Sequence, residues 1–285
     1  MKTRLGRQET LLIAYSQMRK LRAVRTGELM GPLKLTREQE RELFRRMASG
    51  RLIARVRPGL YLVPPQLPLG GVWSPDEILA LNTLMEDRQG RYQICGPNAF
   101  NRYGFDEQIP TRVYAYNNRI SGERTIGAVS LVLIKVADER LGGTETFETP
   151  DGLTAVYSSR VRTLLDAVYD WSRFNGLPRA YEWIRQDLAA RRVKASELAD
   201  VTLEFGDMGA IRRMGQLLER EGVAPALLRK LERALTPSTS QIPWVPRQPK
   251  RGPVNRRWGV VENDRRNARA VADAGDRRCS ADSVA

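Results

Sequence analysis

Three arginines, Arg37, Arg41 and Arg45, recur every four residues in a segment that opens with Thr36. Residues four apart lie on one face of an α-helix, so a helix here presents a stripe of guanidinium groups. A guanidinium can donate two hydrogen bonds to the edge of a guanine or pair with a phosphate. Ion pairs with the neighbouring glutamates are the competing interpretation, in which the stripe is an ordinary solvated helix face.

A second basic pair, Arg55 and Arg57, stands beside Pro58-Gly59. Segments 52–56 and 60–63 are rich in apolar residues and typical of strands, and the residues between them predict a hairpin turn. Period-two alternation predicts that both arginines point to the same face, where they suit a minor groove or flanking phosphates. Protection of an edge strand by charge is the alternative. The predicted DNA-contacting residues are Lys34, Thr36, Arg37, Arg41, Arg45, Arg55 and Arg57.

The elements around these arginines follow a recognisable order. Apolar spacing predicts a first helix over Thr3–Arg19, and Thr26 opens a short second helix that Gly31-Pro32 ends. Thr36 and Gln39 form a capping box that begins a third helix, which runs to Ser49. Three helices followed by a hairpin predict a winged helix-turn-helix over residues 1–66.

The net charge of +14 is concentrated at the two ends of the chain. Residues 1–66 have a net charge of +10, residues 67–240 of −1 and residues 241–285 of +5. A concentrated excess of Lys and Arg favours binding to a polyanion, because the contact releases counterions from phosphates. The predicted partner is double-stranded DNA.

The residues that most enzymes use are missing or badly placed. The chain has no histidine, which excludes Ser-His and Cys-His catalysis and removes the commonest zinc ligand. It lacks a Gly-rich phosphate loop, and Leu133-Ile134-Lys135 lacks the acidic residue of a restriction-type nuclease. Asp166 and Asp170 share a helix face and are interpreted as structural or surface residues. We therefore expect no enzyme activity, no cofactor and no metal.

The rest of the chain predicts a second domain over residues 67–263. It is mixed α/β to about residue 176, with a nearly continuous apolar strand at Ala128–Val136, and helical afterwards. The basic tail, residues 264–285, is predicted to be disordered. The fold class is therefore α+β. No apolar run is long enough to cross a bilayer, and we expect a soluble cytoplasmic protein without membrane contact.

Five short motifs resemble those of AbiEi-type antitoxins, which belong to abortive-infection E toxin–antitoxin systems. The first is the wing segment, and the others follow in the family's order between about Thr3 and Asn263. They are Arg51–Tyr61, Cys95–Phe100 with Tyr103-Gly104-Phe105, Ser159–Asp166, Arg212–Leu218 and Pro253–Gly259.

The resemblance implies that the N-terminal domain represses the chain's own operon by binding its operator. It also implies that the second domain counters a nucleotidyltransferase toxin, without necessarily forming a stable complex with it. A stand-alone winged-helix regulator without a toxin partner is the alternative. A nucleic-acid-processing enzyme is a third interpretation, which the missing catalytic motifs disfavour.

Overall fold

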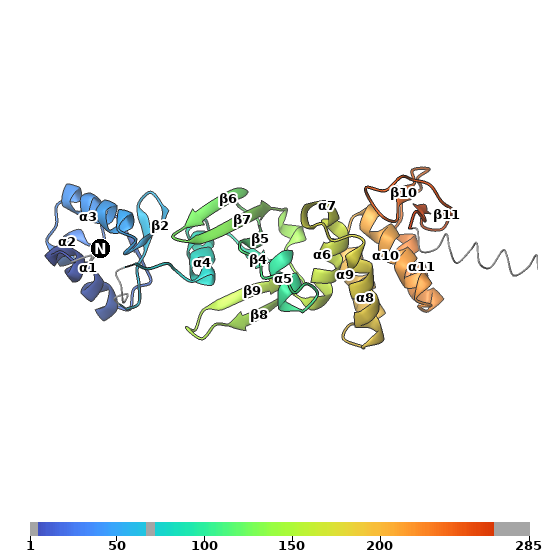
Figure 1. Ribbon diagram of the computed structural model, residues 1–285, viewed down its shortest axis with the longest axis horizontal. Coiled ribbons are helices and arrows are strands. Elements are labelled where there is room, and N and C mark those ends of the chain that lie inside the picture. Colours follow the sequence, from blue (N-terminus) through green and yellow to red (C-terminus); the bar gives the residue numbers. More distant parts are fainter. Residues whose placement is uncertain (1–4, 67–71, 265–285) are drawn as a thin grey trace, which may run out of the picture. The chain divides into compact units, whose positions relative to one another are not determined.

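The structure is a computed structural model of the 285-residue chain, and it describes residues 5–66 and 72–264 (Figure 1). The chain divides into Met1–Ser158, here called unit 1, and Ser159–Ala285, here called unit 2. The predicted boundary at residue 66 therefore falls inside unit 1. Strands and helices build unit 1 and helices dominate unit 2, so the predicted α+β class is confirmed. The predicted tail, residues 264–285, lies outside the described residues except for Asp264.

Unit 1 begins with a helix-and-strand region in the order expected for a winged helix. Its elements are α1 (Arg7–Met18), β1 (Ala23–Arg25), α2 (Met30–Leu33), α3 (Arg37–Ser49), β2 (Ala54–Arg57) and β3 (Leu60–Leu62). Within the described residues, the three strands form an antiparallel sheet in the order β1-β3-β2. The β2–β3 hairpin is the wing, and Figure 1 shows it beside α3.

Helix α3 begins and packs as its sequence predicts. The Thr36 hydroxyl accepts a hydrogen bond from the Gln39 backbone N–H at 3.2 Å, and the Gln39 side chain accepts one from the Thr36 N–H at 2.9 Å. This capping box satisfies two backbone donors that a helix start leaves without partners. The helical spacing of Leu43, Phe44 and Met47 predicts that these side chains face the core. All three are fully buried, so this prediction is confirmed.

The predicted short helix that opens at Thr26 is wrong. Strand β1 ends at Arg25, and a turn follows in which the Glu40 carboxylate accepts hydrogen bonds from the N–H groups of Gly27 and Leu29. Helix α2 begins only at Met30 and includes Gly31-Pro32. Proline is tolerated there because the first turn of a helix has N–H groups without helical partners. The turn held by Glu40 therefore delays the start of the helix, and Gly31-Pro32 does not end it.

A six-stranded mixed sheet occupies the rest of unit 1, counted over the described residues, in the order β6-β7-β5-β4-β9-β8. The pairs β4–β9 and β5–β7 are parallel and the others antiparallel. Its strands are β4 (Tyr92–Ile94), β5 (Val113–Asn117), β6 (Gly122–Ile126), β7 (Val129–Lys135), β8 (Thr144–Glu148) and β9 (Thr154–Ser158). Helices α4 (Glu77–Asp87) and α5 (Pro97–Arg102) and the 3₁₀ helix Asp138–Arg140 accompany it.

The buried β7 was predicted, whereas the edge strands β6 and β8 were not. In β6 only Ile126 is buried, and β8 is almost entirely exposed, so neither has a continuous apolar signal. The run Ser74-Pro75 predicts that Ser74 caps helix α4, and that prediction is wrong. Asp76 is the N-cap, and its carboxylate accepts hydrogen bonds from the N–H groups of Ile78 and Leu79.

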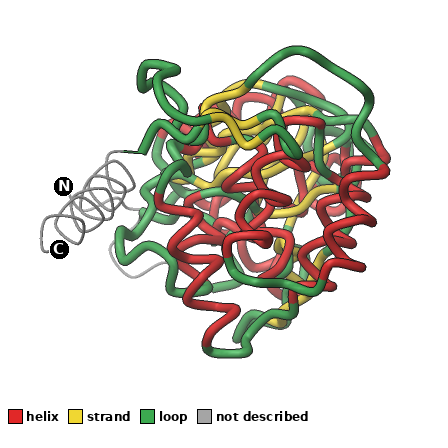
Figure 2. The backbone as a smooth tube through the Cα atoms, turned by 90° about the vertical axis from the view of Figure 1, so that its right-hand side faces the viewer, coloured by secondary structure: helices red, strands yellow, loops and turns green. Residues whose placement is uncertain are grey.

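Unit 2 is a group of packed helices with a small sheet. The helices are α6 (Arg160–Tyr169), α7 (Trp171–Phe174), α8 (Arg179–Ala189), α9 (Ala195–Phe205), α10 (Met208–Arg220) and α11 (Pro225–Arg233). Figure 2 shows several of them side by side, and α6 contacts α8, α9 and α10. Within the described residues, the small sheet has the order β10-β12-β11, formed by Ile242–Pro243, Val260–Val261 and Val254–Asn255.

Two of the sequence motifs pack directly against each other in unit 2. A Cβ atom at Gly215 would lie only 2.3 Å from the Trp258 ring, so this helical position accepts no side chain. Trp258 is 1% exposed, and its indole N–H donates to Glu219 at 2.9 Å. The close approach of α10 to the indole explains why a glycine stands in the middle of a helix, where it costs stability.

The helix α6 motif has a buried ion pair. Arg162 and Asp166 are both 0% exposed, and the guanidinium donates to the carboxylate at 2.8 Å. Leu164 and Leu165, between them, are also fully buried. The interpretation of Asp166 as a structural residue is therefore confirmed, and its position is the core rather than the surface.

Candidate nucleic-acid interface

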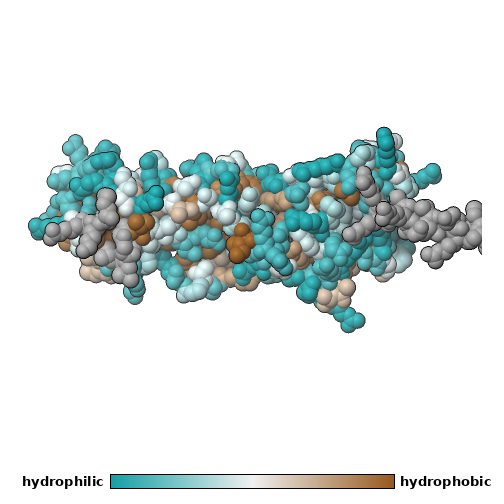
Figure 3. Space-filling view, viewed as in Figure 1, coloured by the Kyte–Doolittle hydropathy of each residue, from teal (hydrophilic) through white to brown (hydrophobic). Residues whose placement is uncertain are grey.

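The arginine stripe of α3 lies on the exposed side of the helix, but its members differ in their surroundings. Arg37, Arg41 and Arg45 are all exposed, and Figure 3 shows a mostly hydrophilic surface over α2 and α3. In residues 5–66 and 72–264, no ion pair or hydrogen bond engages the guanidinium of Arg37 or Arg41. Arg45 instead donates two hydrogen bonds to Glu42, at 2.7 and 2.6 Å, which lower the pKa of that carboxyl.

The wing packs against α3 through an aromatic stack. The rings of Phe44 and Tyr61 lie 4.5 Å apart between centroids, with an interplanar angle of 11°. Tyr61 of β3 is the cross-strand neighbour of Arg55 in β2, and Arg55 is exposed. A stacked aromatic pair restricts the orientation of both elements. The wing therefore has a defined position relative to the arginines of α3.

A groove of about 640 Å³ lies between α3, the β1–α2 turn and the wing. Arg37, Arg41 and Arg55 all contribute to its walls. Glu40 also lines it, but this side chain is buried and accepts hydrogen bonds from the β1–α2 turn. The remaining lining residues are Thr26, Gly27, Met30, Pro58, Gly59 and Tyr61. The groove thus has three basic groups on its rim.

The predicted shared face of Arg55 and Arg57 is wrong. A β-bulge shifts the register between them, so Arg55 lies opposite Tyr61 and Arg57 opposite the adjacent Leu60. An extra residue in one strand interrupts the alternation of side chains. Arg57 accordingly does not line the groove. Its guanidinium donates to both carboxylate oxygens of Asp87, at 2.6 Å each.

Asp87, at the end of α4, connects the wing to the body of unit 1. Its side chain is 4% exposed and also accepts a hydrogen bond from Arg25 of β1 at 2.9 Å. Hydrogen bonds from Arg57, and secondarily from Arg25, lower the pKa of Asp87 to about 2 despite its burial. The geometry makes Arg57 a residue that positions the wing.

The last two predicted residues lie just before α3. Lys34 ends α2 in the left-handed backbone region, at φ 50°, and is exposed. Thr36 is exposed and holds the capping box. Neither contributes to the walls of the groove. The structure therefore brings Arg37, Arg41 and Arg55 together and leaves the other predicted residues around them.

Sequence reasoning missed Glu40 and Asp87, which organise the site without lying in any motif. The pattern offered one signal for Glu40, since it occupies a buried position in an otherwise apolar helix face. Asp87 had no local signal, because its partners Arg25 and Arg57 are 62 and 30 residues away.

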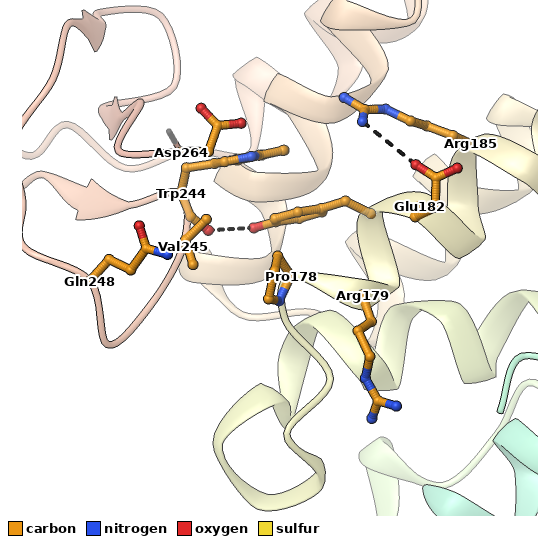
Figure 4. A pocket seen from close by; sticks show the side chains of 9 residues that line it. Pro178, Arg179, Glu182, Arg185, Trp244, Val245, Gln248 and Asp264 are labelled. Atoms are coloured by element: carbon orange, nitrogen blue, oxygen red, sulfur yellow. Dashed lines mark hydrogen bonds and ion pairs between the residues drawn. The ribbon is translucent and has the colours of Figure 1, made fainter. Parts of the chain in front are cut away.

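A second pocket, of about 420 Å³, lies in unit 2 (Figure 4). Its wall includes Tyr181 and Trp244, whose rings stack 3.7 Å apart, and the Tyr181 hydroxyl donates to the Trp244 carbonyl. Burial raises the pKa of Tyr181. Arg185 bonds to Glu221 at 2.8 Å and lies 3.9 Å from Glu182. The Tyr181 hydroxyl and the Arg185 guanidinium of this wall are therefore already engaged by other protein groups.

No group of three or more His, Cys, Asp or Glu side chains in residues 5–66 and 72–264 is placed to hold a metal ion. Over the same residues, no helix is both long and apolar enough to span a membrane.

Comparison with known proteins gives a likeness in fold. No protein-family model and no curated protein sequence matches this chain. The structure is similar to the crystal structure of the RV2827C protein from Mycobacterium tuberculosis, with a TM-score of 0.58 and 14% sequence identity. The match covers 95% of this chain and 96% of that chain. At this identity the likeness shows the fold alone.

Proposed function

We propose that this chain is a double-stranded DNA-binding transcription regulator that docks α3 in the major groove with the wing beside it. The observation that supports the proposal best is the groove at which Arg37, Arg41 and Arg55 meet, none of them ion-paired in the described part of the chain. Guanidinium groups without a carboxylate partner keep their donors for phosphates and base edges.

The dimensions of the two partners agree. An α-helix with its side chains is about 10–12 Å across, and the major groove of B-DNA is about 12 Å wide. Arg37 and Arg41 are one turn apart on the N-terminal half of α3. Recognition helices contact base edges with their N-terminal residues. In this arrangement Arg37 and Arg41 contact bases, whereas Arg55 on the wing contacts a flanking phosphate or the minor groove.

The other predicted residues take supporting roles in this proposal. Lys34 and the N-terminus of α3 at Thr36 lie where a phosphate is favoured, because a helix N-terminus attracts anions. Arg45 contributes after exchanging Glu42 for a phosphate, which costs little because both side chains are exposed. Arg57 acts indirectly by holding the wing through Asp87.

DNA binding is tested with the full chain and a site selected from random duplexes. Arg41→Ala is expected to relax the base preference at one position and to cost about 1–3 kcal/mol on the selected site. Arg19→Ala, an exposed arginine at the end of α1, is the matched control and should change neither quantity. Selection of no consensus, together with equal affinity of both variants, contradicts the docking of α3.

We further propose, on the motif resemblance, that the chain represses its own operon and acts as an antitoxin against a nucleotidyltransferase toxin. Several motif residues of unit 2 are buried, among them Leu164, Leu165, Met214, Leu217 and Leu218. These residues maintain the core. Antitoxin action is therefore assigned to the surface of unit 2. A regulator without a toxin partner is the alternative function.

Growth rescue tests the antitoxin role. Cells that express a nucleotidyltransferase toxin encoded beside this gene should grow again when the full chain is supplied. The double variant Arg37→Gln, Arg41→Gln should lose repression of the operon and still rescue growth, because both residues lie outside unit 2. Failure of the wild-type chain to rescue, or the lack of such a neighbouring gene, leaves the plain regulator.

A further inference from the structure

A strongly basic loop of unit 2 takes no part in the function proposed for α3. The sequence from Gln241 to Val261 contains no acidic residue. Four of its basic residues are exposed: Arg247, Lys250, Arg251 and Arg256. The fifth, Arg257, differs from them, since it pairs with Glu219 at 2.8 Å and Glu232 at 2.9 Å. The loop therefore exposes positive charge that unit 2 does not neutralise locally.

These four side chains are available for a partner. Over the residues that the structure describes, none of them forms an ion pair. Arg247 donates to the Asn175 side chain at 3.1 Å, and Lys250 donates to the Gln241 carbonyl at 3.1 Å. Both contacts are with neutral acceptors, so the charges stay uncompensated.

The loop has a fixed backbone. Asn263 is 7% exposed, and its side-chain amide donates to the carbonyls of Val245, Gln248 and Pro249, while its oxygen accepts from the Val245 N–H. Gly252, at φ 149°, lies so close to the Glu262 carbonyl that a Cβ atom would be 2.1 Å from it. A preorganised loop loses less entropy when it binds.

Two parts of the loop that carry basic residues are tied to one short segment, residues 241–242. Lys250 reaches the carbonyl of Gln241, and the next residue, Ile242, donates its N–H to the Gly259 carbonyl. The Gly259 N–H donates to the Asn255 carbonyl and closes the turn that contains Arg256. Lys250 and the turn with Arg256 are thus both bonded to residues 241–242. We name Arg247, Lys250, Arg251 and Arg256 the C-terminal basic patch.

We propose that the C-terminal basic patch contacts the phosphodiester backbone of duplex DNA, as a second contact independent of base sequence. The inference rests on the proposed function, which brings DNA to the same chain and raises its effective concentration at unit 2. The two tryptophans of the segment, Trp244 and Trp258, are 2% and 1% exposed. Single-stranded nucleic acids are bound by stacking bases on exposed aromatic rings, which this segment does not offer.

The test measures how the affinity of the full chain for a long random-sequence duplex depends on salt. Each lost phosphate contact reduces the slope of log K against log[salt] by about 0.9. The triple variant Lys250→Gln, Arg251→Gln, Arg256→Gln should therefore bind with a slope lower by up to about 2.7. Its urea midpoint should equal that of the wild type, because these side chains are exposed.

The matched control removes the same charge elsewhere in unit 2. Arg191→Gln, Arg229→Gln, Arg233→Gln should leave the slope near the wild-type value, since these exposed arginines lie outside the patch. Equal slopes for both triple variants overturn the proposal. So does a patch variant that loses binding to a structured RNA or to polyglutamate but not to the duplex.

The failure of this inference can be told apart from that of the proposed function. The double variant Arg37→Gln, Arg41→Gln tests α3 alone, with the selected site as probe. If α3 does not bind DNA, this double variant keeps the wild-type affinity, while the triple variant of the C-terminal basic patch still lowers the salt slope. If only the patch inference fails, the double variant loses binding to the selected site and the triple variant keeps the wild-type slope.

Discussion

Asp87→Asn should destabilise unit 1 because it removes the charge that holds Arg57 and Arg25. The folded protein lowers the pKa of Asp87 from 3.8 to about 2. One pKa unit corresponds to about 1.4 kcal/mol, so the ionised carboxylate contributes about 2 kcal/mol to the free energy of unfolding. The Asp87 carboxylate is 4% exposed, whereas Arg25 is 51% exposed. Because solvent screens the Arg25 charge, about 2 kcal/mol is the upper bound of this contribution.

The pH dependence of the stability difference between wild type and Asp87→Asn separates the loss of the charge from an altered packing of the side chain. A carboxyl whose folded pKa is lowered stabilises the protein above its unfolded pKa of 3.8, and that stability is lost as the pH falls toward 2. Urea unfolding followed by circular dichroism should therefore show a difference between wild type and Asp87→Asn of about 2 kcal/mol at pH 6. The difference should narrow between pH 4 and pH 2.

Asp138→Asn is the matched control for Asp87→Asn. Arg91 and Asn118 also lower the pKa of Asp138, but its side chain is 59% exposed, and exposed ion pairs stabilise little. We therefore expect this variant to leave the free energy of unfolding close to that of the wild type. A difference for Asp87→Asn that does not vary with pH, or that equals the control, refutes the reasoning.

Three further variants test the packing of each region by urea unfolding. Gly215→Ala should lower the free energy of unfolding by about 1–3 kcal/mol, because its methyl group overlaps the indole ring of Trp258. Gly209→Ala in the same helix is the control and should not lower it. Equal effects of the two variants would contradict this packing. Asp166→Asn should lower the free energy of unfolding by about 3–5 kcal/mol, because it removes the negative charge that pairs with the buried Arg162. A loss below about 1 kcal/mol would contradict a stabilising role of this ion pair. Thr36→Ala should cost about 1 kcal/mol through loss of the cap, and an unchanged midpoint would exclude the capping box.

Elements whose signals are local could be predicted from the amino-acid sequence. The capping box at Thr36 and the apolar face of α3 depend on residues within one or two helical turns, so periodicity predicted them correctly. The long apolar run of β7 and the helical character of the chain after about residue 176 depend on the same kind of local pattern. The exposed edge strands β6 and β8 have no such pattern, because solvent imposes no alternation on them.

Which arginines share a surface depends on how the chain folds and could not be predicted from local patterns. Arg55 and Arg57 are two residues apart in the sequence, but a β-bulge lies between them. Arg55 therefore lines the groove, whereas Arg57 binds Asp87. A bulge depends on how two strands pair, and the partner carboxylate is 30 residues away in the sequence. Likewise Gly215 has the appearance of an ordinary helical glycine until Trp258 is packed against it. Charge type and helical spacing are local properties, whereas the choice of ion-pair partner requires the folded chain.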